Sequence, residues 1–208
     1  MNSRIVWTTL TLIAGIFLAS CAQVFYTPDA KMLAAGHQTF AIIPPSVSIL
    51  TNSKKVDKEA LKEQQNIEGV NFQKELYAWM LKRKMQGKLA QEIQDLETTN
   101  AKLAKAGYPE APLTTEELCQ VLGVDGVMTC KISMSKPMSE GAAIAIGVVF
   151  GVWGPTNEVN VSLSISDCGK KKLIWNYDHT YSGGVGSTPQ RLVDDLMRRA
   201  SRKMPYFL

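Results

Sequence analysis

The sequence predicts an α/β fold, a mixed sheet with helices packed on it. Two segments near the C-terminus alternate between apolar and polar residues, which is the pattern of paired strands. A long stretch over residues 59–106 instead places apolar residues at helical spacing. The predicted order is strand, long helical region, short helix, strand, apolar segment, hairpin and helix.

The first strand and the long helical region come early in the chain. Residues 39–43 (TFAII) form a short apolar run that ends at Pro44-Pro45, which predicts a buried strand. Within 59–106, one apolar stripe contains Phe72, Leu76, Trp79 and Met80, with Arg83 at its edge, and Leu89, Ile93, Leu96 and Leu103 continue it. Gly69 and Gly87 leave open whether this is one bent helix or two, and Gly107 ends it.

The short helix has a clear beginning and end. Thr114 and Glu117 make the T-x-x-E pattern of a capping box, and Gly123 follows the last apolar residue. Residues 127–134 (VMTCKISM) then alternate as a strand.

The C-terminal part predicts a hairpin and a helix. Val159–Ile165 alternates, residues 167–170 turn the chain, and a second strand places Leu173, Trp175, Tyr177, His179 and Tyr181 on one face. The last helix covers about 189–203, with Ser187 or Thr188 as its N-cap.

The composition and net charge of the chain indicate a folded domain and argue against a nucleic-acid-binding protein. The chain has 208 residues, 45% of them hydrophobic and 20% charged, which is an ordinary balance for a folded core. The net charge of +4 is too small to argue for nucleic-acid binding. Length and pattern predict a single α/β domain over 38–208.

Residues 1–20 predict a secretory signal peptide. Arg4 gives a positive start, and an apolar run from Ile5 to Phe17 follows, which is too short for a spanning helix. The next residues, Leu18-Ala19-Ser20-Cys21, resemble the lipobox of bacterial lipoproteins. That resemblance implies cleavage between Ser20 and Cys21, a diacylglyceryl thioether on Cys21, and usually acylation of the new amine.

The resemblance also implies a location. Ala22 and Gln23 lack the Asp that resembles an inner-membrane retention signal, so the expected place is the outer membrane, facing the periplasm. Residues 21–37 show little periodicity and predict a lipid-anchored tether.

The other three cysteines are Cys119, Cys130 and Cys168. The expected compartment permits disulfides, and an odd number allows at most one bridge within the chain. Burial as small apolar residues is the favoured interpretation. No cysteine or histidine spacing typical of a metal site occurs, so no metal or other cofactor is expected.

Two segments carry a wider resemblance. EELCQVLGVDGVMTCKIS (residues 116–133) and VNVSLSISDCGKKKLIWNYDHTYSGG (residues 159–184) resemble a helix–strand unit and its following hairpin in envelope proteins. The groups are the N-terminal domain of the Tol-system translocation protein, the curli-secretion lipoproteins and related periplasmic lipoproteins. The resemblance implies a domain that binds other envelope proteins, with no catalytic residues to carry over.

Residues 141–155 (GAAIAIGVVFGVWGP) contain no charge and four glycines. A buried strand or hairpin edge, a membrane-contacting loop and an oligomer contact all remain open, and Gly147-x-x-x-Gly151 would let two backbones approach. The candidate membrane or oligomer contacts are Ile144, Ile146, Gly147, Val149, Phe150, Gly151 and Trp153.

No catalytic set is predicted. His37 and His179 stand in no recognised catalytic motif, and His179 is expected to pack with Tyr177 and Tyr181. Residues 183–188 follow a strand and open a helix, as a phosphate cradle does, but a capping loop is favoured because no Lys precedes the Ser/Thr. The expected function is therefore a non-catalytic protein-interaction module of the cell envelope. The alternative is a subunit of a membrane-associated homo-oligomer or export pore.

Overall fold

A computed structural model describes residues 22–51, 57–136, 158–182 and 188–207. Its elements are β1 (Gln23–Tyr26), α2 (Ala30–Gly36), β2 (Thr39–Ile42), β3 (Ser46–Thr51), α3 (Lys58–Met85), β4 (Glu92–Ile93), α4 (Leu96–Lys105), α5 (Thr115–Leu122), β5 (Gly126–Lys136), β6 (Glu158–Asp167), β7 (Lys172–Ser182), α7 (Pro189–Ala200), η3 (Ser201–Lys203) and η4 (Pro205–Phe207).

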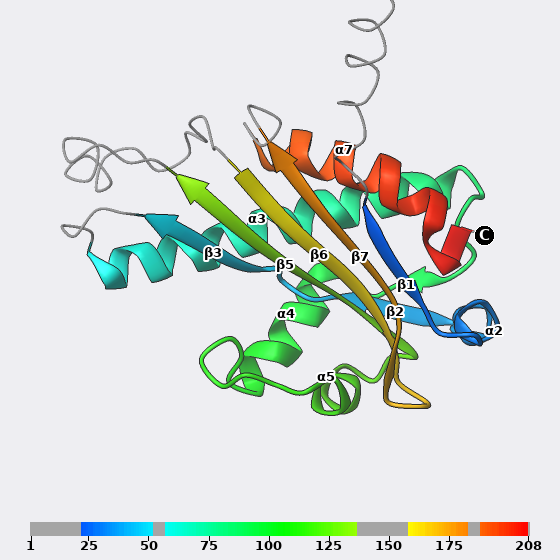
Figure 1. Cartoon of the computed structure of the whole chain (residues 1–208). Coiled ribbons are helices and arrows are strands. Elements are labelled where there is room, and N and C mark those ends of the chain that lie inside the picture. The colour runs from blue at the N-terminus through cyan, green and yellow to red at the C-terminus, as the bar shows by residue number, and fades with distance from the viewer. Residues whose placement is uncertain (1–21, 52–56, 137–157, 183–187, 208) are drawn as a thin grey trace, which may run out of the picture.

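These strands form one mixed seven-stranded sheet, which confirms the predicted fold class (Figure 1). The strand order is β1-β7-β6-β5-β2-β4, and β3 also pairs with β5. The pairs β1–β7, β7–β6 and β6–β5 are antiparallel, whereas β2 and β3 run parallel to β5 and β4 runs parallel to β2.

The long strand β5 pairs with two different strands along one edge, one after the other. Its first residues pair with β2 and its later residues pair with β3. Pro44-Pro45 separates β2 from β3, because proline has no N–H to donate to a ladder. At this break α3 comes close, since a Cβ at Gly69 would lie 2.5 Å from the carbonyl oxygen of Pro45. Only glycine fits there without a shift.

One face of the sheet is covered by α3 and α7. The buried stripe of α3 includes Phe72, Leu76 and Met80, as predicted, while Trp79 is only partly buried. The buried face of α7 is also apolar, and Thr188 caps its first turn by accepting from the N–H of Arg191. Inward-facing residues of β3, β5, β6, β7 and β1 complete this larger core.

The other face is covered only in part. The helices α4 and α5 place Leu103, Leu118 and Leu122 against Ala41 and nearby residues of β2 and β5. In Figure 1 these helices lie below the sheet, and no helix of the described residues covers the side of β5, β6 and β7 that faces the viewer.

The helix α5 begins and ends as the sequence predicts. Thr114 and Glu117 form the capping box, with Thr114 N–H donating to Glu117 at 2.7 Å. Gly123 ends the helix with φ +63°, in the left-handed region that favours glycine.

The structure differs from expectation in two places and decides one open alternative. Residues 22–36 contain β1 and α2, where the sequence predicts a tether. Of the two alternatives for the long helical region, the structure has two helices, α3 and α4, and the two-residue strand β4 lies between them. Leu173 is 41% exposed, because an irregularity between Ile165 and Ser166 shifts the register and turns Ile174 inward instead.

Candidate interaction surface

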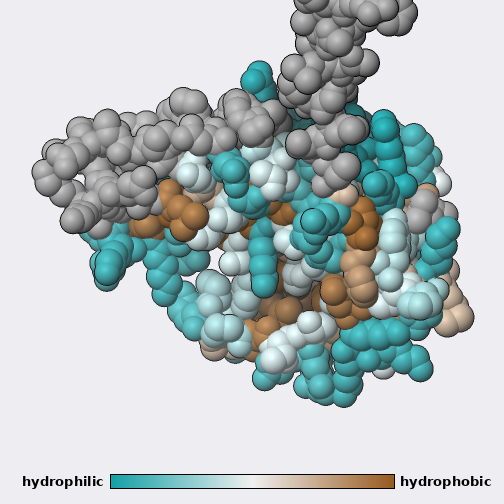
Figure 2. All heavy atoms as spheres, viewed as in Figure 1, coloured by the Kyte–Doolittle hydropathy of each residue, from teal (hydrophilic) through white to brown (hydrophobic). Residues whose placement is uncertain are grey.

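The uncovered half of the sheet is a polar surface built from four strands. Register places Lys131, Ser162 and Asp178 in one row across β5, β6 and β7, and the next rows repeat the arrangement. We call this the open face, and define it as Ser46, Ser48, Thr129, Lys131, Ser133, Asn160, Ser162, Ser164, Asn176, Asp178 and Thr180. A hollow of about 460 Å³ lies over most of these residues. Figure 2 shows teal and white atoms over much of this side of the molecule.

Alternation in the strands explains why this face is polar. In β6, for example, Val159, Val161 and Leu163 point into the helical core, so the residues between them point outward. The same alternation in β5 was predicted and is confirmed, with Cys130 and Ile132 buried on either side of Lys131.

Hydrogen bonds between side chains hold the polar side chains of the open face in place. The amide oxygen of Asn176 accepts from Ser164 at 2.7 Å and from Ser162 at 3.1 Å, and its amide nitrogen donates to Asp178 at 2.7 Å. Thr180 donates to Asn160 at 2.6 Å on the next row. Because these side chains are held by one another, little side-chain freedom is left for a partner to remove.

An apolar side chain borders the open face. Phe25 in β1 lies opposite Asn176, so both side chains project from the same side of the sheet. Phe25 is 49% exposed. An exposed aromatic ring beside polar side chains is typical of protein-binding surfaces.

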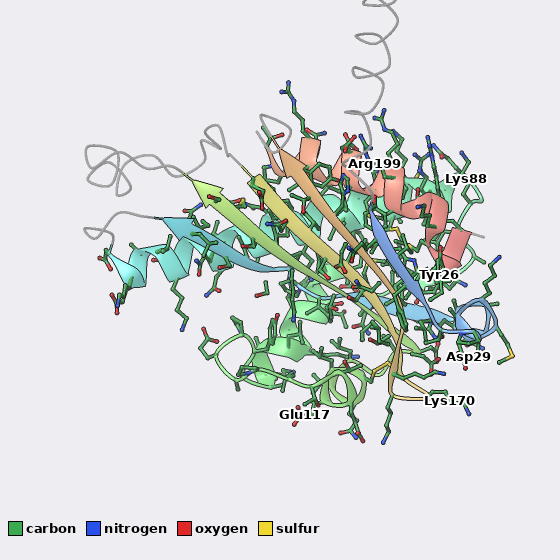
Figure 3. All side chains as sticks on the ribbon, in the orientation of Figure 1. Tyr26, Asp29, Lys88, Glu117, Lys170 and Arg199 are labelled. Atoms are coloured by element: carbon green, nitrogen blue, oxygen red, sulfur yellow. A yellow bond between two sulfur atoms is a disulfide. The ribbon has the colours of Figure 1, made fainter. Side chains whose placement is uncertain are left out.

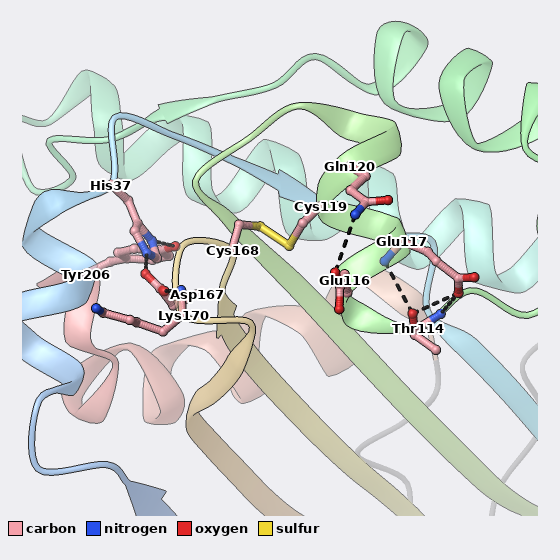
Figure 4. Close-up of a disulfide and its surroundings, with 10 residues drawn as sticks. All are labelled: His37, Thr114, Glu116, Glu117, Cys119, Gln120, Asp167, Cys168, Lys170 and Tyr206. Atoms are coloured by element: carbon pink, nitrogen blue, oxygen red, sulfur yellow. Dashed lines mark hydrogen bonds and ion pairs between the residues drawn. A yellow bond between two sulfur atoms is a disulfide. The ribbon is translucent and has the colours of Figure 1, made fainter.

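A second cluster combines a histidine, a carboxylate and a phenol, all buried. Nε2 of His37 lies 2.8 Å from Oδ1 of Asp167, and its Nδ1 lies 2.8 Å from the hydroxyl of Tyr206 (Figure 4). His37 follows α2, Asp167 ends β6 and Tyr206 belongs to η4. The cluster therefore connects the segment after α2 and the C-terminal η4 to the β6–β7 turn. The sequence analysis did not identify it, because the three residues are far apart in the chain.

Burial decides what this cluster can do. The three residues are only 5–6% exposed, and both ring nitrogens of His37 are already engaged, by Asp167 and by Tyr206. Burial and the nearby carboxylates of Asp167 and Asp125 raise the pKa of Tyr206. Its hydroxyl therefore stays protonated and can donate to His37, whose other nitrogen then donates to Asp167. The two hydrogen bonds of His37 therefore have the geometry of contacts that stabilise the fold.

A disulfide stands next to this cluster. Cys119 in α5 is bonded to Cys168, which directly follows Asp167 (Figure 4). The preferred interpretation of the cysteines, burial as single apolar residues, holds for Cys130 but is wrong for the other two. The odd count already limited the chain to one bridge, but only the fold brings α5 beside the β6–β7 turn.

The predicted packing of His179 is confirmed. Its ring lies 6.1 Å from Tyr177 and 4.4 Å from Tyr181, measured between centroids. Burial lowers the pKa of His179. The residue belongs to the core beneath α7, and its neighbour Asp178 points to the open face.

The other predicted site residues lie outside the described residues. These are Ser20, Cys21, Ile144, Ile146, Gly147, Val149, Phe150, Gly151 and Trp153, and most of the loop 183–188. In the described part of the chain, no helix is long and apolar enough to cross a bilayer. The same residues contain no group of three or more His, Cys, Asp or Glu side chains arranged to hold a metal ion.

The sequence matches no protein-family model and no curated protein. Several solved structures resemble the chain in fold, among them the following three. The PelC dodecamer from Paraburkholderia phytofirmans has 14% identity and a TM-score of 0.38, over 90% of this chain and 97% of that one. Lipoprotein GNA1162 from Neisseria meningitidis has 12% identity and a TM-score of 0.42, over 79% and 96%. The LpoB C-terminal domain from Salmonella enterica has 11% identity and a TM-score of 0.34, over 74% and 95%.

Proposed function

We propose that this chain is a bacterial lipoprotein whose α/β domain binds another envelope protein without catalysing a reaction. In this proposal, lipid on Cys21 anchors it to the outer membrane, facing the periplasm. The observation that carries the binding role is the open face, a half-sheet of polar side chains that no helix of the described residues covers.

The chemistry of the open face favours a protein partner. Lys131 and Asp178 give it charges of both signs within one row, and the serine and asparagine side chains between them offer donors and acceptors. Phe25 supplies an apolar contact at one border. Charges that can pair across an interface, with an aromatic residue nearby, are features of specific protein recognition.

The burial of the His37 cluster supports a non-catalytic role. A general base must come within about 3 Å of the proton that it removes. His37 is 6% exposed and has both ring nitrogens engaged, by Asp167 and by Tyr206.

The binding role is tested by site-specific photo-crosslinking in intact cells. A photoreactive amino acid at Ser162 on the open face should give an adduct of one reproducible mass. The matched control places it at Lys74, an exposed position on α3 behind the sheet. The adduct should disappear when Lys131→Glu is added, with the far-ultraviolet circular dichroism unchanged. Equal adducts from both positions, or an adduct that survives Lys131→Glu, would refute binding through the open face.

The anchor has a separate test. Mass spectrometry of the mature N-terminal peptide should show Cys21 carrying diacylglycerol. A Cys21→Ser chain should leave the membrane fraction, whereas Cys130→Ser, which removes a buried thiol, should remain there. Unchanged fractionation of the Cys21→Ser chain would refute the anchor.

A further inference from the structure

The ends of two helices bring together a group of basic side chains. Residues 82–88, at the end of α3, hold four basic residues and no acidic one. Residues 198–203, at the end of α7 and in η3, also hold four and no acidic one. We define the basic surface as Lys82, Arg83, Lys84, Lys88, Arg198, Arg199, Arg202 and Lys203.

These two groups belong to one surface. The helices α3 and α7 pack against each other on the covered face of the sheet. Trp79 of α3 lies 6.0 Å from Phe207, which follows α7, and the guanidinium of Arg83 lies 4.5 Å above the Trp79 ring. In Figure 3, Lys88 and Arg199 lie on the same side of the molecule, and Lys170 lies toward the opposite side.

Most of this charge is not neutralised by neighbours. Arg199 pairs with Asp195 at 2.9 Å, and Lys84 pairs with Glu92 at 2.8 Å. Among the described residues, the other six members form no ion pair with a carboxylate. Leu196, Met197 and Ala200 of α7 face the core, so Arg198 and Arg202 project away from the sheet.

The chain geometry keeps the basic surface close to the proposed lipid. β1 begins at Gln23, two residues after Cys21, and the hydroxyl of Tyr26 at its end donates to the carbonyl of Lys203. Tyr26 is the fifth residue after Cys21, and five residue-to-residue steps span at most about 18 Å. β1 is fixed to the sheet by β7, so the distance cannot grow without breaking strand pairs.

We infer that the basic surface docks on the anionic headgroups of the membrane that holds the lipid anchor. The inference rests on the proposed anchor at Cys21. Positive side chains near a bilayer are attracted to anionic lipid within about 10 Å at ordinary ionic strength. The basic surface lies on the helical layer and the open face on the other side of the sheet. Docking therefore turns the open face away from the lipid.

The test uses the mature lipidated chain reconstituted in two kinds of vesicle. One contains phosphatidylcholine alone, and the other contains phosphatidylcholine mixed with phosphatidylglycerol. Lysines are acetylated under limiting reagent, and mass spectrometry gives the rate at each position. Lys88 and Lys203 should react several-fold more slowly on the anionic vesicles. The exposed Lys105 and Lys170, away from the basic surface, should react equally on both.

Two further measurements identify the cause. High salt should remove the difference at Lys88, because it screens charge. The double variant R198Q/R202Q should also remove it, whereas the control K105Q/K170Q should not. Equal rates of Lys88 and Lys203 on both vesicles would overturn the inference. Slowing that occurs only in intact cells would also overturn it, and would assign the surface to an acidic protein.

Failure of the anchor gives a different result from failure of the docking. A chain without lipid shows no lipid mass on Cys21 and does not float with phosphatidylcholine vesicles. Flotation with the anionic vesicles alone would then still support the basic surface, and no flotation with either would overturn it.

Discussion

The substitution Gly126→Ala tests whether the His37 cluster holds the fold together. Gly126 begins β5 directly beneath the cluster. A Cβ there would lie 2.6 Å from Nδ1 of His37 and 2.6 Å from the hydroxyl of Tyr206. An ordinary contact needs about 3.4 Å, so both groups must move by about 0.8 Å.

Neither neighbour can move freely. His37 is held by Asp167, and the ring of Tyr206 is stacked on the buried Phe40 with centroids 4.7 Å apart. Overpacking of this kind costs about 1–3 kcal/mol. Loss of the hydrogen bond between His37 and Tyr206 adds about 1 kcal/mol. We expect a total destabilisation of about 2–4 kcal/mol, which for a domain of this size lowers Tm by about 4–16 °C.

Urea unfolding of the purified protein, followed by circular dichroism, measures this change. The matched control is Gly36→Ala, because a Cβ at Gly36 meets nothing within 4 Å and its φ is not positive. The control should be as stable as the parent or slightly more stable. If Gly126→Ala unfolds within about 0.5 kcal/mol of the parent, the cluster has room to spare and the reasoning is wrong.

Three other predictions concern stability and reactivity. Reducing the disulfide, or replacing Cys168 by Ser, should lower the free energy of unfolding by about 4 kcal/mol, because the disulfide closes a loop of 49 residues. Urea unfolding with and without reductant measures this change, and an unchanged urea midpoint would contradict the prediction. Burial raises the pKa of Cys130 to about 12, so its thiol should resist iodoacetamide at pH 8 until urea unfolds the chain. Its contribution to stability should be full below pH 9 and should fall as the pH rises toward 12, because the unfolded chain loses this proton first. Thr114→Ala removes the cap of α5 and should cost about 1 kcal/mol in thermal unfolding, whereas Thr115→Ala, one position inside the helix, should cost less.

The predictable part of this fold is the part with strong local signals. The capping box at Thr114, the alternation of β6 and the stripe of α3 each depend on residues near one another in the chain, and the structure confirms all three. In contrast, β1 has only four residues and pairs with β7, so its own pattern is too short to predict a strand. β4 is shorter still, so Gly87 indicated a possible break between α3 and α4 but nothing in the sequence indicated a strand there.

The candidate surface was predictable only in its parts. Alternation predicted that Lys131 and Ser162 face away from the core, but which half of the sheet the helices leave uncovered depends on where α4 and α5 pack. The His37 cluster gave no sequence signal, because a lone histidine, an aspartate at a turn and a tyrosine near the C-terminus resemble ordinary surface residues. Their pairing results from tertiary structure alone.

The pairing of β1 with β7 sets an order of events in folding. Gln23 lies opposite Asp178, about 150 residues later in the chain. A strand that depends on so distant a partner forms late in folding. The segment that becomes β1 therefore stays unpaired until β7 has formed. Under the proposed lipid anchor, this delay would leave the neighbouring Cys21 accessible to an acylating enzyme, and pairing with β7 would then hold the anchored end against the sheet.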